Sequence, residues 1–147
     1  MHNLERTMTI IKPDAVGRRL VGEIIQRLEH EKFRIIALKM VQLSMAQAEG
    51  FYAVHRRRPF FPSLTKFMTE NRVVVMVLEA DDAIGRLREV MGATDPAKAA
   101  EGTIRQMFGS SIERNAIHGS DAPETARFEI GYFFNAFEIF GGRSESR

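Results

Sequence analysis

The first part of the chain switches between strand-like and helix-like patterns of apolar residues. Residues 6–12 are rich in Thr and Ile and stop at Pro13, which indicates a strand that ends in a turn. From Val21 onward, apolar residues recur at i, i+3, i+4 and i+7, which predicts an amphipathic helix over residues 21–31. The apolar, β-branched stretch 33–43 predicts a second strand, so this region has the order of a βαβ unit or a split version of one.

The rest of the chain continues this mixture of helices and strands. Ser44 and Gln47 have the spacing of a helix capping box. Residues 73–78 form an unbroken apolar run, which predicts a strand that is covered on both faces. The remaining expected elements are a helix through residues 64–68, a helix from residue 81 or 82, a loop over 92–102, an extended segment over 116–118 and a helix over 121–134.

Together these elements predict an α+β sandwich in which helices cover one face of a small sheet. The 147 residues suffice for one domain with a single core, and apolar and charged fractions of 44% and 27% are typical of globular proteins. We therefore expect one domain over residues 1–140. Residues 141–147 are small and polar, so a flexible, frayed tail is expected there.

Composition and motifs exclude several classes of protein. There is no cysteine, so neither disulfides nor thiolate catalysis are possible. Residues 1–6 lack the apolar core of a signal peptide, and the longest apolar run is too short to cross a bilayer, so a cytoplasmic protein without a membrane partner is expected. Neither a G-x-x-x-x-G-K-[ST] loop nor a G-x-G-x-x-G motif is present, which argues against Walker-type kinases, dinucleotide-binding folds and protein kinases.

The strongest candidate for chemistry is His118, in the segment NAIHGSD at residues 115–121. It precedes Gly119, where the backbone can approach another segment closely, and a predicted helix start, which favours anions. A neutral imidazole is a competent nucleophile. Glu129 falls on the apolar stripe of that helix, where an unpaired carboxylate is costly, so we expect it to pair with His118 and Ser120 to join the two. The alternatives are a His118 that only bonds the backbone of a turn and a Glu129 that reaches water.

Phosphate transfer would also need cations and hydrogen-bond donors around the transferred group. Each candidate cation is more often a solvated surface charge, and the arginine run is most simply an exposed loop. The net charge of +2 is too small to demand a nucleic-acid partner but suits nucleotides if the cations converge. Phe60 and Phe61 lie between prolines, and one ring could stack on a base while the other packs inward. The polar candidates are Lys12, Arg88, Thr94, Thr103, Arg105 and the arginines at residues 56–58.

In six blocks the sequence resembles the nucleoside diphosphate kinase family. The segment NAIHGSD looks like the active-site signature of that family. The resemblance implies a ferredoxin-like βαββαβ fold with an antiparallel four-stranded sheet, and a homo-oligomer built from dimers into a tetramer or hexamer. The other blocks are ERT leading to IKPD over residues 5–14, GEII at 22–25, RPFF at 58–61, GATDP at 92–96 and GTIR at 102–105.

The resemblance also implies a reaction and a set of site residues. The γ-phosphate of a nucleoside triphosphate would pass to a nucleoside diphosphate by a ping-pong mechanism, through a phosphohistidine at His118. The four histidines and the acids show no metal-ligand spacing, so Mg²⁺ would be held mainly by the substrate's phosphates. Glu129 and Ser120 would orient His118. Lys12 and Tyr52 would lie near the transferred group, Arg88, Thr94 and Arg105 on the phosphates, Lys12 and Asn115 on the sugar, and Phe60, Leu64 and Ile112 on the base.

Two positions depart from the family pattern. Glu101 stands where a proline often precedes Gly102, and the loss of a fixed φ could loosen that loop. Met107 stands where an acidic residue is common, which removes a possible partner for Arg105.

Two other functions use these residues less completely. The chain could hold nucleic acid without chemistry, through the nucleotide pocket or the arginine run, and its binding would then depend strongly on salt. It could instead be a ferredoxin-like sensor of small ligands in which His118 is structural. We expect nucleic-acid binding to be secondary at most, because His118, Glu129 and every phosphate ligand are intact.

Overall fold

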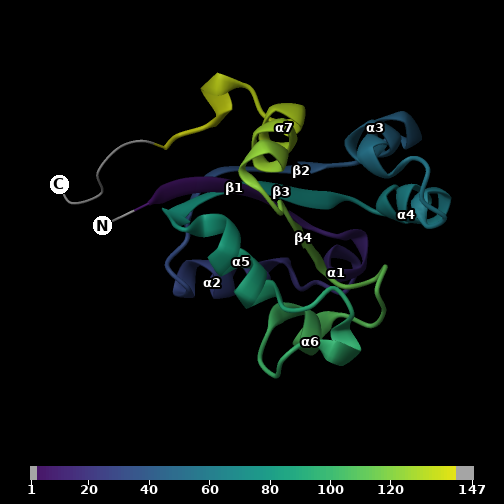
Figure 1. The fold of residues 1–147 in the computed structure, drawn as a ribbon, viewed down its shortest axis with the longest axis horizontal. Coiled ribbons are helices and arrows are strands. Elements are labelled where there is room, and N and C mark those ends of the chain that lie inside the picture. Colours follow the sequence, from purple (N-terminus) through teal and green to yellow (C-terminus); the bar gives the residue numbers. More distant parts are fainter. Residues whose placement is uncertain (1–2, 142–147) are drawn as a thin grey trace.

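The computed structural model describes residues 3–141. Its centre is a four-stranded antiparallel sheet with the strand order β2-β3-β1-β4 (Figure 1). In chain order the elements are β1 (Leu4–Ile11), α1 (Pro13–Gly17), α2 (Val21–His30), β2 (Arg34–Val41), α3 (Met45–Phe51), a 3-10 turn (Ala53–His55), α4 (Phe61–Met68), β3 (Val73–Asp81), α5 (Ala83–Met91), a 3-10 turn (Pro96–Lys98), α6 (Ile104–Phe108), β4 (Ile117–Gly119), α7 (Pro123–Phe133) and a 3-10 turn (Ala136–Glu138).

The predicted ferredoxin-like α+β fold is confirmed. The strands and the helices α2 and α5 follow the βαββαβ order, and the remaining helices are additions to it. Local signals also form as expected. Gln47 donates its backbone N–H to Ser44 Oγ at 3.1 Å, and Ser44 donates its own to Gln47 Oε1 at 2.9 Å, so the capping box starts α3.

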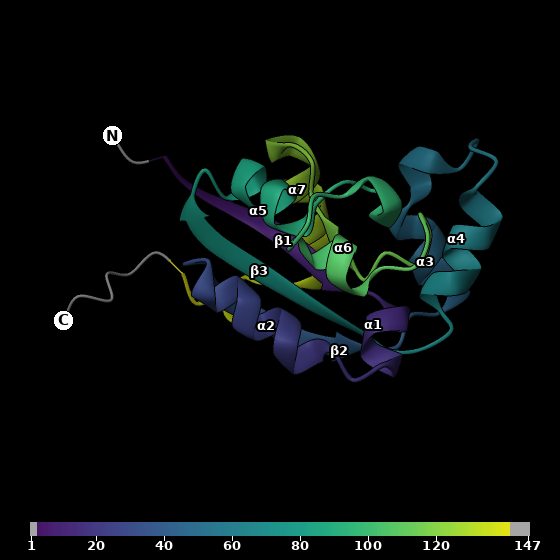
Figure 2. The same cartoon turned by 90° about the horizontal axis from the view of Figure 1, so that it is seen from below.

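One feature of the prediction is wrong, because helices cover both faces of the sheet rather than one. Helices α2 and α5 pack on one face, while α7 lies on the other (Figures 1 and 2). Residues 73–80 of the central strand β3 are all buried, which requires cover on both sides. The unbroken apolar run of β3 therefore pointed to the correct arrangement.

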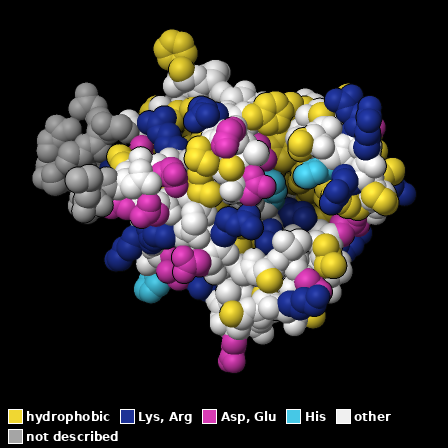
Figure 3. All heavy atoms as spheres, viewed as in Figure 1, with side chains coloured by type: hydrophobic (Ala, Val, Ile, Leu, Met, Phe, Trp, Pro, Cys, Tyr) yellow, Lys and Arg dark blue, Asp and Glu magenta, His cyan; other side chains and the backbone are white. Residues whose placement is uncertain are grey.

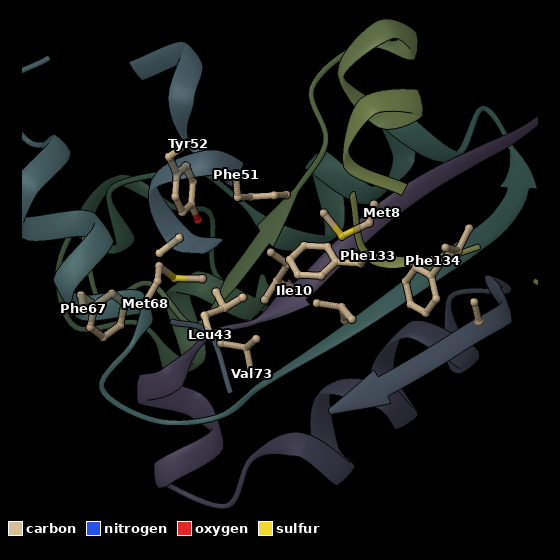
Figure 4. Packing of buried hydrophobic residues seen from close by; sticks show 14 of the residues in the cluster. Met8, Ile10, Leu43, Phe51, Tyr52, Phe67, Met68, Val73, Phe133 and Phe134 are labelled. Atoms are coloured by element: carbon tan, nitrogen blue, oxygen red, sulfur yellow. The ribbon is translucent and has the colours of Figure 1, made fainter. Parts of the chain in front are cut away.

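The hydrophobic core on the face of the sheet that α7 covers also includes side chains of α3 and α4, which together form the α3–α4 arm. Met8 and Ile10 of β1 pack with Phe133 of α7 and with Phe51 at the end of α3 (Figure 4). Tyr52 follows Phe51 and belongs to the same cluster, with 6% of its surface exposed. Packing of this arm therefore fixes the position of Tyr52 relative to β1 and α7.

The sequence patterns missed α1 and α6. Each helix has five residues, too few for an apolar repeat to stand out. α1 follows the turn that was expected at Pro13, whereas α6 lies between the expected loop over 92–102 and the expected extended segment over 116–118, where no element was predicted. The tail predicted for residues 141–147 lies outside the described residues, apart from Gly141.

Candidate active site

A cleft of about 370 Å³ lies between the α3–α4 arm, helix α5 and the segments that flank β4. Figure 3 shows a hollow on this face, with dark-blue Lys and Arg side chains within it and cyan His side chains at its edge. Most of the predicted site residues line this cleft: Lys12, Tyr52, Phe60, Leu64, Arg88, Thr94, Arg105, Ile112, Asn115 and His118. The two others, Ser120 and Glu129, form a hydrogen-bonded group with His118.

The backbone of His118 is fixed by strand β4. His118 lies opposite Ile10 in the antiparallel pair of β4 with β1, and its carbonyl accepts a hydrogen bond from Thr9 Oγ1 at 2.7 Å. Gly119 permits a close approach to α5, because a Cβ there would come within 2.9 Å of Leu87 and Met91 side-chain atoms. Gly119 therefore has the expected role: without a side chain there, β4 can pack closely against α5.

The imidazole of His118 is oriented by a buried acid. Its Nε2 lies 3.0 Å from Glu129 Oε1, and Ser120 Oγ donates to the same oxygen at 2.6 Å. Only 13% of the Glu129 side chain is exposed and its Oε1 is bonded to His118 and Ser120, so it faces these partners rather than extending into solvent. A carboxylate only accepts, so we assign the proton to Nε2 and the free lone pair to Nδ1.

Aromatic rings hold the other sides of the imidazole. Phe51 meets it edge-to-face, with ring centroids 5.5 Å apart, and Tyr52 does so at 6.2 Å. Burial, followed by the charge of Glu129, raises the pKa of the Tyr52 phenol above its ordinary value. Tyr52 therefore remains a neutral hydrogen-bond donor beside His118 at neutral pH.

Lys12 directly follows the last residue of β1, and its side chain is a buried cation that lines the cleft. Its Nζ donates to the main-chain carbonyl of Glu113 at 2.8 Å and to Asn115 Oδ1 at 3.0 Å. Burial is the largest cause that lowers the pKa of Lys12, to about 8, and the negative charge of Asp14 opposes it. Lys12 is therefore mostly charged at neutral pH but loses its proton more easily than an exposed lysine.

Arg105 is a second buried cation, carried by α6. Its Nη1 donates to the Gly92 carbonyl at 3.1 Å and its Nη2 to the Ile117 carbonyl at 2.8 Å. Burial, followed by repulsion from Arg88, lowers the pKa of Arg105 to about 10, so it stays charged at neutral pH. Its buried Nε has no hydrogen-bond partner among residues 3–141. These contacts do not involve Met107, so that departure leaves Arg105 in place.

The segment before His118 makes a tight turn. Ile117 donates its N–H to the Asn115 carbonyl at 2.9 Å, so Ala116 is the central residue of a γ-turn, with φ of 76°. A non-glycine residue in this region costs about 1–3 kcal/mol. The turn directs the Asn115 side chain toward Lys12 on one side and toward the Thr94 carbonyl, at 3.0 Å, on the other.

Comparison with known proteins supplies the family. The family model described as nucleoside diphosphate kinase matches residues 5–139. The chain belongs to the nucleoside diphosphate kinase family. It is therefore a phosphotransferase. It is 64% identical to the nucleoside diphosphate kinase of Desulfosudis oleivorans over 138 residues, which cover 94% of this chain and 99% of the relative.

Solved structures of nucleoside diphosphate kinases share the fold. The Aquifex aeolicus nucleoside diphosphate kinase is 47% identical, with a TM-score of 0.91, and the match covers 92% of this chain and 99% of that one. The enzyme from Halobacterium salinarum, solved in complex with CDP, is 38% identical, also with a TM-score of 0.91, covering 97% of this chain and 95% of that one.

In this nucleoside diphosphate kinase family member, the part of the cleft formed by Phe60, Leu64 and Ile112 is apolar and open. Phe60 is 43% exposed and Ile112 is 60% exposed, while Leu64 is half-buried. Phe61, the neighbour of Phe60, packs against the core, so the two rings divide as the sequence suggested. His55 contacts Phe60, with ring centroids 5.5 Å apart.

Sequence reasoning missed some of the cleft residues and misplaced others. Gly119 and Asp121 belong to the NAIHGSD segment but were not expected to line a cleft, whereas the only signal for His55, Met91 and Glu113 was a predicted residue beside them or one helical turn away. Thr103 does not line the cleft; it caps α6, where it accepts from the Gln106 N–H at 3.3 Å. The arginines at residues 56–58 are exposed outside the cleft. The missed lining residues are His55, Met91, Glu113, Gly119 and Asp121.

The cleft offers cations rather than a metal cage. Within the described part of the chain, no group of three His, Cys, Asp or Glu side chains could hold a metal ion. Lys12, Arg88 and Arg105 are instead suited to phosphate oxygens. No helix within residues 3–141 is long and apolar enough to cross a membrane.

Proposed function

We propose that the chain transfers the γ-phosphate of a nucleoside triphosphate to a nucleoside diphosphate, through a phosphohistidine at His118. The observation that carries this proposal is the hydrogen bond that His118 Nε2 donates to Glu129, in a cleft lined by Lys12, Arg88 and Arg105. It supplies an oriented nucleophile and the cations that a transferred phosphoryl group requires.

In the first half-reaction, the lone pair of His118 Nδ1 attacks the γ-phosphorus in line. A P–N bond forms, the P–O bond to the β-phosphate breaks, and the diphosphate leaves with the electron pair. Nε2 keeps its proton, and the hydrogen bond to Glu129 stabilises the positive charge that develops on the ring. Lys12, Arg105 and the Tyr52 phenol stabilise charge on the equatorial and leaving oxygens.

In the second half-reaction, a terminal oxygen of another diphosphate attacks the same phosphorus. The P–N bond breaks and its electron pair returns to Nδ1, which regenerates His118 without net proton transfer. Both nucleotides would use the same cleft in turn, which is a ping-pong sequence.

Phe60, Leu64 and Ile112 would receive the base, and Lys12 and Asn115 the sugar hydroxyls. Stacking on Phe60 accepts any nucleobase, because every base has a π-face. Arg88 and Thr94, which are exposed at the cleft, would bind the phosphates together with Arg105. The Halobacterium salinarum relative in complex with CDP supports a nucleotide in this family's site.

Mg²⁺ would enter as part of the nucleotide substrate. When bound to the β- and γ-phosphates it would supply charge neutralisation, which the cationic cleft complements. We propose that the nucleotide's phosphates, rather than a set of protein side chains, hold the ion.

The decisive experiment is labelling without an acceptor. Incubation with γ-labelled triphosphate and Mg²⁺ should leave about one acid-labile, alkali-stable label per chain and release an equal amount of diphosphate. His118→Ala should lose both the label and turnover. His30→Ala, an exposed histidine on α2, is the matched control and should keep both. A His118→Ala protein with full turnover would show that the mechanism is wrong.

We further propose that the chain assembles through β2 into dimers, which then form a tetramer or hexamer. Among the described strands β2 pairs only with β3, and Leu38 and Met40 on it are each 54% exposed. Phe137 and Phe140 line a groove beside the same strand and are 92% and 78% exposed. A second copy would bury these side chains, and light scattering after chromatography would give the assembly size.

Three expectations stay predictions from the sequence. Cell fractionation would test the cytoplasmic location, and limited proteolysis would test a single domain over residues 1–140. Nucleic-acid binding through the exposed arginines at residues 56–58 would be secondary, and its salt dependence would reveal it.

A further inference from the structure

The strained turn before His118 is clamped by one short segment of the chain. Both main-chain polar atoms of Ala116 are bonded to residues 12–14: Lys12 N–H donates to the Ala116 carbonyl at 2.9 Å, and the Ala116 N–H donates to Asp14 Oδ2 at 3.0 Å. Pro13 lies between Lys12 and Asp14, and its ring fixes the φ angle of the backbone that links them. The γ-turn therefore depends on the end of β1 and on a single side chain, Asp14.

The second oxygen of Asp14 is unusual. Asp14 Oδ1 is buried and makes no hydrogen bond to any of residues 3–141. An uncompensated buried acceptor is costly, so its position calls for a reason. The carboxylate stands near Lys12, and its charge is the largest effect that opposes the loss of the Lys12 proton through burial.

We propose that Asp14 is a positioning residue of the phosphotransfer site. Its carboxylate holds the γ-turn that places Asn115 beside Lys12 and leads into His118, and it keeps Lys12 cationic inside the cleft. Asp14 does not line the cleft, so it acts through these residues rather than on the nucleotide. The inference rests on the proposed function for its catalytic meaning, although the geometry and charge it describes can be measured separately.

Asp14 acts on Lys12 against two other charged groups. Arg105, from α6, disfavours the Lys12 charge, and Glu113, from the segment before β4, favours it less than Asp14 does. The simpler alternative is that Asp14 only stabilises the first turn of α1, as acids often do at helix starts. That role would affect stability without changing the pH dependence of catalysis.

Three substitutions at Asp14 separate its hydrogen bond from its charge. Asp14→Asn keeps a carbonyl that can accept from Ala116 but removes the charge. Asp14→Ala removes both, and Asp14→Glu keeps the charge but displaces the acceptor. Glu23→Gln is the matched control, because Glu23 is an exposed acid in the first turn of α2.

For Asp14→Asn, the alkaline limb of kcat/KM should move about one pH unit lower, because a nearby opposite charge usually shifts a pKa by about 1–3 units. Asp14→Ala should also lose about 100-fold in the rate of His118 phosphorylation, as expected when reacting groups are displaced by about 1 Å. Asp14→Glu should keep the alkaline limb of the wild type while phosphorylation slows. Glu23→Gln should change neither quantity. In a Lys12→Gln background, Asp14→Asn should have no further effect on the pH profile.

NMR titration of the Lys12 ammonium gives the same test without turnover. A Lys12 pKa that is unchanged in Asp14→Asn, or an Asp14→Ala protein whose activity falls only with its unfolded fraction, would overturn the inference. A wild-type protein that accepts no phosphate would instead overturn the proposed function, and the Lys12 titration would still decide on Asp14.

Discussion

The two ends of the cleft are built differently. At the phosphate end, the side chains of Lys12, Arg105 and Asn115 are buried, and each makes two hydrogen bonds to fixed groups. At the base end, Phe60 and Ile112 are largely exposed and contribute apolar surface alone. Phosphoryl transfer requires exact placement of charge, whereas stacking on a base tolerates variation, so rigidity is concentrated where the bonds change.

The phosphate end also shows how cations can be buried without being neutralised. Lys12 and Arg105 donate to carbonyl oxygens: those of Glu113 and the Asn115 amide for Lys12, and those of Gly92 and Ile117 for Arg105. Neutral carbonyls satisfy the donors but leave the positive charge in place, whereas carboxylates at the same positions would cancel it. The cleft therefore keeps an attraction for phosphate that a set of tight ion pairs would lack.

The largest effect at the phosphate end is expected from Arg105→Met. It removes a guanidinium group and its positive charge from the lining of the cleft, so kcat/KM should fall by about 10²–10³, as for the loss of one preorganised donor. It also leaves the Gly92 and Ile117 carbonyls without their hydrogen-bond donor, which should lower the free energy of unfolding by about 1–3 kcal/mol. Steady-state kinetics and denaturant unfolding measure the two.

Arg57→Met is the control for that experiment, because Arg57 is exposed in the loop after the Ala53–His55 turn. It should leave both quantities nearly unchanged. If Arg105→Met reduced kcat/KM by less than about tenfold, the phosphate end would not require exact placement of charge, and it would not differ from the base end in this respect.

The base end and the nucleophile were the parts of the site that the sequence could predict. Periodicity placed Glu129 on the inward stripe of its helix, and the cost of an unpaired acid then indicated His118 as its partner. The pair of phenylalanines divided into an exposed and a packed ring because adjacent residues cannot both face inward. Such arguments succeed when the residues involved lie close together in the sequence, as His118 and Glu129 or Phe60 and Phe61 do.

The phosphate end could not be predicted in the same way, because its partners are main-chain groups brought together by the fold. No pattern of side chains shows that Gly92 and Ile117 will present carbonyls to Arg105, or that Ala116 will adopt a positive φ. The second helical layer was missed for a related reason, since the cover on a sheet depends on packing between distant elements. It was nevertheless implied by the apolar run at residues 73–78.

A smaller effect at the same end is expected from pH. If charged Lys12 is required, kcat/KM should fall about tenfold per pH unit above the Lys12 pKa of about 8. The folded pKa lies below the ordinary value of 10.5, so between these two values the unfolded chain binds the extra proton. The contribution of Lys12 to stability therefore rises with pH while activity falls, and the loss cannot be caused by unfolding of this origin.

Measurements of activity and stability on the same proteins would test whether Lys12 causes this pH dependence. kcat/KM and the free energy of unfolding should be followed from about pH 7 to about pH 9 for the wild type and for Lys12→Gln. The substituted protein should be slower throughout and should lack the alkaline limb assigned to Lys12. The same limb in both proteins would mean that another group titrates, and Lys12 would no longer explain the pH dependence.

The smallest effect is expected at the base end, from Phe60→Ala. Stacking contributes about 1–3 kcal/mol per base, and the lower value applies because Phe60 is partly solvated, so KM should rise roughly fivefold. The increase should be similar for all four bases, with kcat little changed, because the ring contacts bound nucleotide equally in the ground and transition states. Phe128→Ala is the matched control, since Phe128 is an exposed phenylalanine on α7 that does not line the cleft. A large fall in kcat for Phe60→Ala would mean that the base end also positions the phosphate, and the two ends would then have to be treated as one rigid site.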